Sequence, residues 1–318
     1  MATSLPQPLL RALDPRELEL IIMPTEQCNF RCTYCYEDFS IGRMKRATID
    51  GLRRLMQSRA PELDRLDLSW FGGEPLAAKD VVLELSELAS HLARQHSKLR
   101  YRGSITTNAY LLGGELFREL VRLGNRSFQI TLDGWAEQHD ATRRRADGAG
   151  TFARIWRNLL ALRGVPGAFS VNLRIHLQPH NRDGVETLLD RLIDEFGGDP
   201  RFDAFFKPVG DWGGPRAGQI ETLGAADARS VQENLERRWH QVRPRPSPVP
   251  TREPRPFVCY ASKPNSLMIR ADGHVGKCTV MLNDRRNAIG TLHSDGTIAL
   301  HPGRLGPWLD SRQIGSHR

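Results

Sequence analysis

Short apolar runs alternate with longer amphipathic segments between residues 18 and 208, and this alternation constrains the fold more than any other feature. The runs, each predicted to be a strand, are 18–23, 66–71, 102–107, 127–132, 169–177 and 202–208. Strands that alternate with helices across short connections form parallel sheets with right-handed crossovers. Because a closed barrel needs eight such units, we expect an α/β fold with an open, partial barrel of six β/α units.

Polar and glycine residues follow the predicted strands where those strands end. In chain order they are the cysteine loop 28–35, Gly72–Pro75, Thr107–Asn108, Asp133–Gly134, and Gln178 with His180. Barrel enzymes build their sites from the loops at the carboxyl ends of the strands. The sequence therefore predicts one site assembled from several of these loops.

Three of the five cysteines, Cys28, Cys32 and Cys35, lie in a C-x3-C-x2-C spacing. Three thiolates on a short loop can bind one inorganic centre, and on a cubane iron–sulfur cluster they leave one iron open to a small molecule. Zinc, disulfides and buried structural thiols are the alternatives. Zinc usually takes four ligands, and no fourth Cys or His lies nearby at finger spacing. Disulfides are disfavoured without a secretion signal, and structural thiols do not explain Tyr34 in this spacing.

Cys28, Cys32, Tyr34 and Cys35 resemble the C-x3-C-x-aromatic-C signature of the radical S-adenosylmethionine (radical SAM) enzymes. The resemblance implies that the three cysteines hold a [4Fe–4S] cluster whose fourth iron binds S-adenosylmethionine. It further implies that the cofactor is reductively cleaved to a 5′-deoxyadenosyl radical, which abstracts hydrogen from the substrate. The partial (β/α)6 TIM barrel of this superfamily agrees with the fold predicted above.

Two further segments resemble motifs of the same superfamily. Gly72, Gly73 and Glu74 match its GGE motif, which implies that Glu74 holds the α-amino group of S-adenosylmethionine. Asn108, followed by Ala109 where glycine is common, resembles its TNG segment. This implies that Asn108 lies beside the ribose or the carboxylate of the cofactor.

Four further segments resemble a narrower group of the superfamily, the peptide-modifying members that carry a SPASM domain. These segments are Thr131–Gly134, His139–Asp140, Arg143 and Gly150–Phe152. This group includes sulfatase-maturating enzymes and maturases of ribosomally made peptides. The resemblance implies that Thr131 and Asp133 lie near the cofactor ribose and that Arg143 pairs with its carboxylate. An ordinary turn at Asp133–Gly134 is the alternative, and no catalytic residue is identified.

Cys259 and Cys278 flank a predicted hairpin in a C-x13-G-x4-C pattern that resembles the first half of a SPASM domain. A full SPASM domain continues with several cysteines, whereas no cysteine follows Cys278. Two thiolates cannot complete a four-ligand cluster. An auxiliary cluster completed by Asp272 or His274, reduced structural thiols and a disulfide therefore all remain open.

The predicted domain organisation has five parts. They are a flexible lead-in at 1–16, a radical SAM partial barrel at 17–215, a helix and proline-rich linker at 216–256, a truncated SPASM-like β unit at 257–301, and a tail at 302–318.

The composition, with 39% hydrophobic and 26% charged residues, is that of a soluble globular protein. No apolar run approaches the roughly 20 residues that span a bilayer, and residues 1–8 lack the features of a signal peptide. We therefore expect a cytoplasmic protein without a membrane partner. The net charge of +8 comes mostly from arginines scattered along helix-like segments, which is typical of a solvated basic surface. An acidic peptide or protein partner is the next interpretation, ahead of nucleic acid.

The leading hypothesis is a radical SAM enzyme that crosslinks or oxidises a peptide or protein side chain. It would receive electrons from a flavodoxin- or ferredoxin-type donor. The alternatives are a radical SAM enzyme acting on a small-molecule natural-product intermediate and a catalytically silent scaffold that binds cluster and cofactor.

Overall fold

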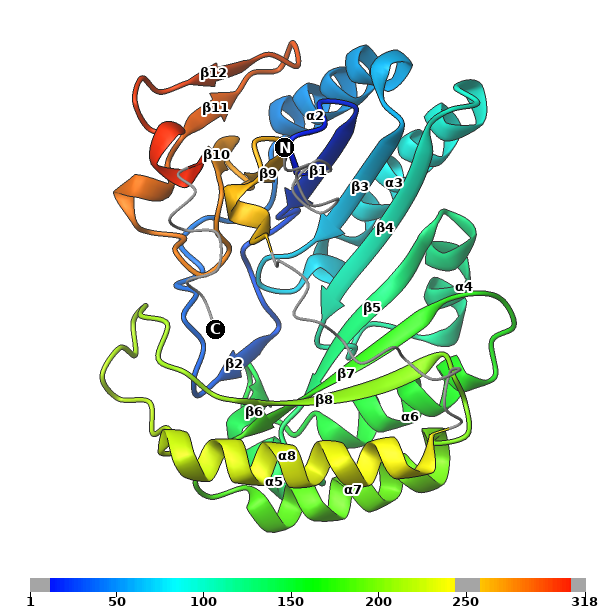
Figure 1. Cartoon of the computed structure of the whole chain (residues 1–318), viewed down its shortest axis with the longest axis vertical. Coiled ribbons are helices and arrows are strands. Elements are labelled where there is room, and N and C mark those ends of the chain that lie inside the picture. Colours follow the sequence, from blue (N-terminus) through cyan, green and yellow to red (C-terminus); the bar gives the residue numbers. More distant parts are fainter. Residues whose placement is uncertain (1–11, 244–257, 310–318) are drawn as a thin grey trace, which may run out of the picture. The chain divides into compact units, whose positions relative to one another are not determined.

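The computed structural model describes residues 12–243 and 258–309 (Figure 1). Most of the predicted lead-in, the proline-rich linker at 244–257 and the tail beyond residue 309 lie outside the described residues. The chain forms two compact units. Unit 1 comprises residues 1–27, 39–103 and 249–318, and unit 2 comprises residues 28–38 and 104–248.

Unit 1 is built on strand β1 (Glu17–Ile22), which pairs in parallel with β3 (Arg65–Trp70) and β9 (Ser266–Ile269). Strands β10 (His274–Gly276), β11 (Gly290–Leu292) and β12 (Ile298–Leu300) continue from β9 in antiparallel pairs. In Figure 1 the late strands, coloured yellow to red, extend the sheet beyond the blue β1. The predicted SPASM-like β unit is therefore joined to the first barrel strand by backbone hydrogen bonds.

Helices α2 (Arg46–Arg59) and α3 (Lys79–Gln95) belong to unit 1. Helix α3 buries Val81, Val82, Leu85, Ala89 and Leu92. This spacing of three and four residues gives the helix one apolar stripe for packing. Its opposite face is polar, as the sequence pattern predicts.

Unit 2 contains the parallel strands β5 (Asn125–Leu132), β7 (Ser170–Leu177) and β8 (Phe202–Pro208). Strand β4 (Arg100–Thr107) is divided between the units after Gly103. The helices of unit 2 are α4 (Gly114–Arg122), α5 (Glu137–Thr142), α6 (Phe152–Arg163), α7 (Arg182–Phe196) and α8 (Ala225–Val242). Along β7 every second residue is buried, so the strand has one apolar face and one polar face.

Aromatic side chains fill the apolar core of unit 2. The rings of Phe117 and Phe128 lie 4.6 Å apart, and those of Phe196 and Phe202 also lie 4.6 Å apart. Trp239 of α8 is fully buried and donates its indole N–H to Asp203 at 2.9 Å. Because a buried indole needs an acceptor, this bond fixes α8 against β8.

Several short elements have no counterpart among the predicted ones. They are β2 (Phe30–Cys32), β6 (Arg143–Arg145), α5 and the 3-10 turns η1 (Ala60–Glu62), η2 (Pro75–Ala78), η3 (Tyr260–Ser262), η4 (Arg285–Asn287) and η5 (Gly306–Leu309). Strand β10 ends at Gly276, because the N–H groups of Lys277 and Cys278 donate to the Asn287 side chain instead of to a neighbouring strand. Trp308 of η5 is buried and donates to Arg286 O at 3.0 Å, so residues 306–309 form an ordered turn.

The α/β class with a mostly parallel sheet is confirmed. The bounds of the six predicted strands differ from those of β1, β3, β4, β5, β7 and β8 by two residues or fewer. Helix α2 begins at Arg46, and no side chain caps it.

Candidate iron–sulfur site

The cysteine loop is held by a two-stranded antiparallel ribbon in unit 2. Strand β2 pairs with β6, and this register places Cys32 opposite Arg143. The Thr33 N–H extends the pairing by donating to Thr142 O at 2.9 Å. The cysteine loop and the three arginines of β6, Arg143–Arg145, are far apart in the sequence but therefore lie side by side.

The three cysteines of the loop are reduced thiols, and each is half-buried. The Cys28 Sγ accepts a hydrogen bond from the Phe30 N–H at 3.3 Å and lies 3.9 Å from Asn108 Nδ2. Burial raises the pKa of Cys32, and it raises that of Cys35 to about 12. The metal-free loop therefore carries neutral thiols, and a metal must displace their protons on binding.

The donor chemistry of the loop fits a cubane iron–sulfur cluster. Such clusters take thiolate ligands, and the loop offers three thiols on one short segment that solvent can reach. Within residues 12–243 and 258–309, no three His, Cys, Asp or Glu side chains gather closely enough to hold a single metal ion.

Tyr34 anchors the cysteine loop to a buried polar network. Its hydroxyl donates to Asp133 Oδ1 at 2.9 Å and accepts from Arg143 at 2.8 Å. The Nδ1 atom of His176 lies 3.0 Å from the same oxygen, and the two rings meet edge to face at 5.0 Å. The cysteine loop, the end of β5, the start of β6 and the end of β7 thus meet at one phenol.

Asp133 is fully buried, and its carboxylate is occupied by protein donors. Thr142 donates to Oδ2 at 2.7 Å and Gln178 at 3.3 Å, while His176 Nδ1 lies 3.3 Å from Oδ1. Burial alone would raise the pKa of Asp133, but the hydrogen bond with His176 and the charge of Arg143 outweigh burial and hold the pKa below its usual range. Asp133, which the resemblance places near the cofactor ribose, therefore accepts hydrogen bonds from several protein side chains and holds them together.

Arg143 has one donor that the network does not use. Its guanidinium bonds to Tyr34 and lies 5.8 Å over the ring of Phe30. Its Nε is buried and has no hydrogen-bond acceptor among the described residues. Since a buried N–H without an acceptor costs free energy, this donor is suited to a ligand such as the carboxylate that the resemblance implies.

His139 and Asp140 hold the backbone around the network. The Nδ1 atom of the fully buried His139 accepts from the Asp133 N–H at 3.3 Å, and its Nε2 lies 3.1 Å from Thr151 Oγ1. Asp140 Oδ1 accepts from the N–H groups of Thr151 and Phe152 at 2.7 and 2.9 Å. A carboxylate in this position caps the start of α6, so the two motif residues have structural roles.

His139 makes the stability depend on pH. Burial, aided by the nearby positive charge of Arg143, lowers the pKa of His139 from 6.5 to about 4. The unfolded chain therefore takes up this proton first. The associated stability, on the order of 3 kcal/mol, is present above pH 6.5 and is lost as the pH falls towards 4. In urea unfolding at a series of pH values, His139→Gln should show a smaller loss of unfolding free energy across this window. The His91→Gln variant, which changes an exposed histidine, is the control. The prediction is contradicted if the unfolding free energy falls equally with pH in the wild type and in both variants.

Asn108 and Ala109 form a tight turn at the end of β4. Asn108 donates to Asn29 Oδ1 at 2.8 Å, and its own Oδ1 accepts from the Tyr110 N–H at 3.0 Å. Ala109 has a positive φ of 60°, a conformation that glycine adopts more readily. The side chain of Asn108 therefore lies against the cysteine loop, where the sequence predicts a cofactor contact.

Gly72, Gly73 and Glu74 lie in unit 1 and pack against the chain that leads into the cysteine loop. Glu74 is fully buried, and its carboxylate accepts from the Leu76 N–H at 3.0 Å. The Glu74 N–H donates to Gln27 O at 3.0 Å. Gly72 has a positive φ of 103°. The two glycines therefore allow close approach to protein backbone.

Gly73→Ala is expected to destabilise unit 1. The added Cβ would lie 2.5 Å from Gln27 O, which is closer than van der Waals contact permits. Overpacking of this kind costs about 1–3 kcal/mol. Because Gln27 directly precedes Cys28, iron content should fall as well. Gly113→Ala, with nothing within 4 Å of the new Cβ, is the matched control. Chemical denaturation and iron assays compare the two, and equal stability would contradict the prediction.

Cys259 and Cys278 line one cavity in unit 1. The cavity has a volume of 570 Å³, and its walls include Met281 and Trp308. The residues that line it add no further Cys and no His, Asp or Glu. Two thiols fall short of the four ligands of a cluster, so the predicted auxiliary cluster would need a ligand from elsewhere.

Asp272 and His274 do not supply that ligand in this structure. They pair with each other at 2.8 Å and line a separate cavity. The cysteine pair and the Asp272–His274 pair therefore line two different cavities of the C-terminal strands, and an auxiliary cluster that joins them stays a prediction.

Sequence reasoning missed three contributors to the site, His176, Thr142 and Asn181. Asn181 donates to Asp133 O at 2.7 Å and to His176 O at 2.9 Å. The alternation along β7 could have identified His176, because it lies on the polar face of that strand. His180, by contrast, is exposed and pairs with Glu221.

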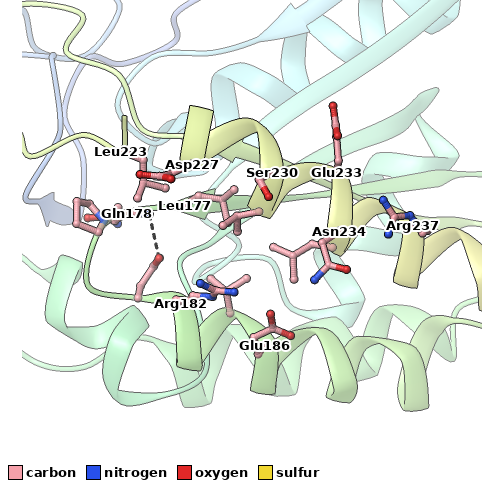
Figure 2. A pocket seen from close by; sticks show the side chains of 15 residues that line it. Leu177, Gln178, Arg182, Glu186, Leu223, Asp227, Ser230, Glu233, Asn234 and Arg237 are labelled. Carbon is pink, nitrogen blue, oxygen red and sulfur yellow. Dashed lines mark hydrogen bonds between the residues drawn. The ribbon is translucent and has the colours of Figure 1, made fainter. Parts of the chain in front are cut away.

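A polar cleft of 560 Å³ opens between α7 and α8, at the end of β7. Figure 2 shows Arg182 and Glu186 reaching from α7 into the space below α8. Gln178 connects this cleft to the network, because its side chain bonds to Asp133 and its N–H donates to Asn181 at 2.9 Å. The buried site and the open cleft therefore share residues.

An α/β fold with a three-cysteine loop beside a buried Tyr–Asp–Arg network defines a candidate iron–sulfur protein. Residues 22–192, more than half of the chain, match the Radical SAM superfamily, and the chain belongs to this superfamily. Its members use a [4Fe–4S] cluster and S-adenosylmethionine. The predicted superfamily and its cofactors are confirmed.

Curated relatives include a GTP 3′,8-cyclase of Tolumonas auensis, 32% identical over 34% of this chain and 31% of the relative. A cysteine-type anaerobic sulfatase-maturating enzyme of Clostridium perfringens is 26% identical over 44% of this chain and 39% of the relative. The match thus spans about a third of each relative's length.

Among solved structures, native anSMEcpe with bound AdoMet and Cp18Cys peptide superposes with a TM-score of 0.64 at 19% identity. It covers 87% of this chain and 77% of that one, which supports the fold. In the part of this chain that the structure describes, no helix is long and apolar enough to cross a bilayer.

Proposed function

We propose that this protein is a radical SAM enzyme that modifies a side chain of a peptide or protein. The observation that carries the proposal is the β2–β6 ribbon, which sets a three-thiol loop opposite Arg143. Cys28, Cys32 and Cys35 would hold the [4Fe–4S] cluster. When bound, the cluster and S-adenosylmethionine supply a carbon radical that abstracts hydrogen.

The protein's own part is to fix this loop and to orient the cofactor. Tyr34, held by Asp133 and Arg143, locks the loop against β5 and β6. The free Nε of Arg143 would bind the cofactor carboxylate, and Asn108 would bind the carboxylate or ribose. Glu74 would bind the α-amino group, and Gly72 and Gly73 would hold its loop in place. Thr131 would contact the ribose, as the resemblance implies.

The peptide substrate class rests on the likeness to the sulfatase-maturating enzyme and to a structure with a bound peptide. The net charge of +8 favours an acidic peptide. Single electrons would come from a flavodoxin- or ferredoxin-type donor. An oxygen-sensitive cluster suits the cytoplasm, and no part in nucleic-acid binding is proposed.

Action on a small molecule is the second candidate, because a GTP 3′,8-cyclase is among the relatives. Co-expression with the short open reading frames that neighbour the gene separates the two classes. Mass spectrometry should find a peptide with altered hydrogen content, and only when the three cysteines are intact. If 5′-deoxyadenosine forms in vitro but every neighbouring peptide stays unmodified, the small-molecule class is favoured. If no 5′-deoxyadenosine forms at all, the protein is a silent scaffold.

A further inference from the structure

Strand β7 carries an arginine, Arg174, on its polar face. It lies two residues before His176 and therefore points to the same side of the sheet. The register places it between Thr131 of β5 and Phe205 of β8. Arg174 thus belongs to the same strand face as the residue that contacts Tyr34.

Arg174 has no counter-ion in the part of the chain that the structure describes. Its Nε is buried without a hydrogen-bond acceptor, and no carboxylate pairs with it. Burial lowers the pKa of Arg174, although the Tyr36 and Tyr34 hydroxyls partly offset this effect. Arg174 is half-buried as a residue, but a buried and unpaired N–H on a cation is costly. Arg201 in the same unit, by contrast, pairs with Asp199 at 2.7 Å.

The surroundings of Arg174 favour a planar anion. Its guanidinium lies 5.7 Å from the ring centre of Phe205, and stacking of this kind holds the planar group in place. Arg143 adds a second positive charge nearby, and the carboxylate of Asp133 is already occupied. A guanidinium fixed through its face leaves its edge free for the two parallel hydrogen bonds that a carboxylate accepts.

We propose that Arg174, supported by Phe205, binds a carboxylate group of a ligand at the polar face of β7. The proposal rests on the function proposed above, which provides two sources for that group. One is the carboxylate of S-adenosylmethionine, which Arg174 would share with Arg143. The other is an acidic side chain of the peptide substrate.

Two binding assays on the reconstituted protein distinguish the sources. The first measures the Kd for S-adenosylmethionine by equilibrium dialysis. The second selects from a synthetic peptide library in which each Asp or Glu peptide is matched by its Asn or Gln counterpart, with S-adenosylmethionine present. Retained peptides are counted by mass spectrometry. Arg174→Gln is the test variant. Arg174→Lys keeps the positive charge but cannot donate two parallel hydrogen bonds. Arg229→Gln, which changes an exposed residue of α8, is the control for net charge.

Arg174→Gln should weaken one of the two interactions by about 10- to 100-fold, Arg174→Lys by less, and Arg229→Gln should change neither. Weaker binding of S-adenosylmethionine assigns the carboxylate to the cofactor, and a lost preference for acidic peptides assigns it to the substrate. If Arg174→Gln changes neither the Kd for S-adenosylmethionine nor the preference for acidic peptides, the proposal is overturned.

Thermal melting separates a binding role from a structural one. Loss of an unpaired buried cation should leave the melting temperature of the ligand-free protein unchanged or higher. A lower melting temperature for Arg174→Gln shows a structural role and also overturns the proposal. These readouts do not depend on turnover. If the wild-type protein forms no 5′-deoxyadenosine, the proposed function is refuted. The binding and melting assays test only the role of Arg174.

Discussion

Cys32→Ala is expected to abolish the formation of 5′-deoxyadenosine from S-adenosylmethionine in dithionite-reduced protein. With one thiol removed, the loop offers two ligands, too few to keep a cubane with three protein-bound irons. Cys32 also lies opposite Arg143 in the β2–β6 ribbon, and the side chain across from it is therefore a cation and not a metal ligand. Product formation is measured by liquid chromatography and mass spectrometry after anoxic reconstitution.

Two controls accompany this variant. Cys278→Ala removes a half-buried thiol outside the loop and should retain product formation. Iron counted in a Cys28/Cys32/Cys35→Ala triple variant then reports on the auxiliary site. Iron that persists in the triple variant requires Cys259 and Cys278 as ligands, and its absence refutes an auxiliary cluster. Full activity of Cys32→Ala would contradict the assignment of the loop.

Asp133→Asn is expected to cause the largest loss of stability, about 3–5 kcal/mol. The carboxylate accepts hydrogen bonds from Tyr34 and Thr142 and offsets the buried charge of Arg143. An amide keeps the shape but removes the charge and turns one acceptor into a donor. Urea unfolding of the anoxically purified protein measures the change.

Asp147→Asn is the matched control in the same unit. Its carboxylate pairs with Arg145 at 2.6 Å, but both side chains are exposed to solvent. Exposed pairs contribute about 1 kcal/mol or less. Equal losses in the two variants would show that the buried network contributes no more than a surface pair.

The sequence predicted the regular elements of residues 17–208 well because their apolar patterns are local. The predicted strand 169–177, for example, differs from β7 by one residue at its start, and the predicted strand 202–208 has the bounds of β8. Strands β2 and β6 were missed, because each is three residues long and exists only through its partner. No local pattern encodes such a pairing.

The polar network shows a second limit of sequence reasoning. Tyr34 and Asp133 were each identified from motifs, but the bond between them joins residues 99 positions apart. Arg174 and His176 belong to no motif, and only the register of β5, β7 and β8 reveals their neighbours. Motifs therefore identify some of the residues of the site, such as Tyr34 and Asp133. Their hydrogen-bond partners, and residues outside any motif, can be identified only from the fold.

Iron and sulfide content of the anoxically purified protein, together with its absorption spectrum, tests the central assignment most directly. Three thiols that hold a cubane predict about four irons and four sulfides per chain, with broad absorption near 400 nm (a rough expectation for such centres). Both signals should disappear in the triple cysteine variant if no auxiliary cluster is present. Colourless wild-type protein, or zinc in place of iron, would contradict the assignment.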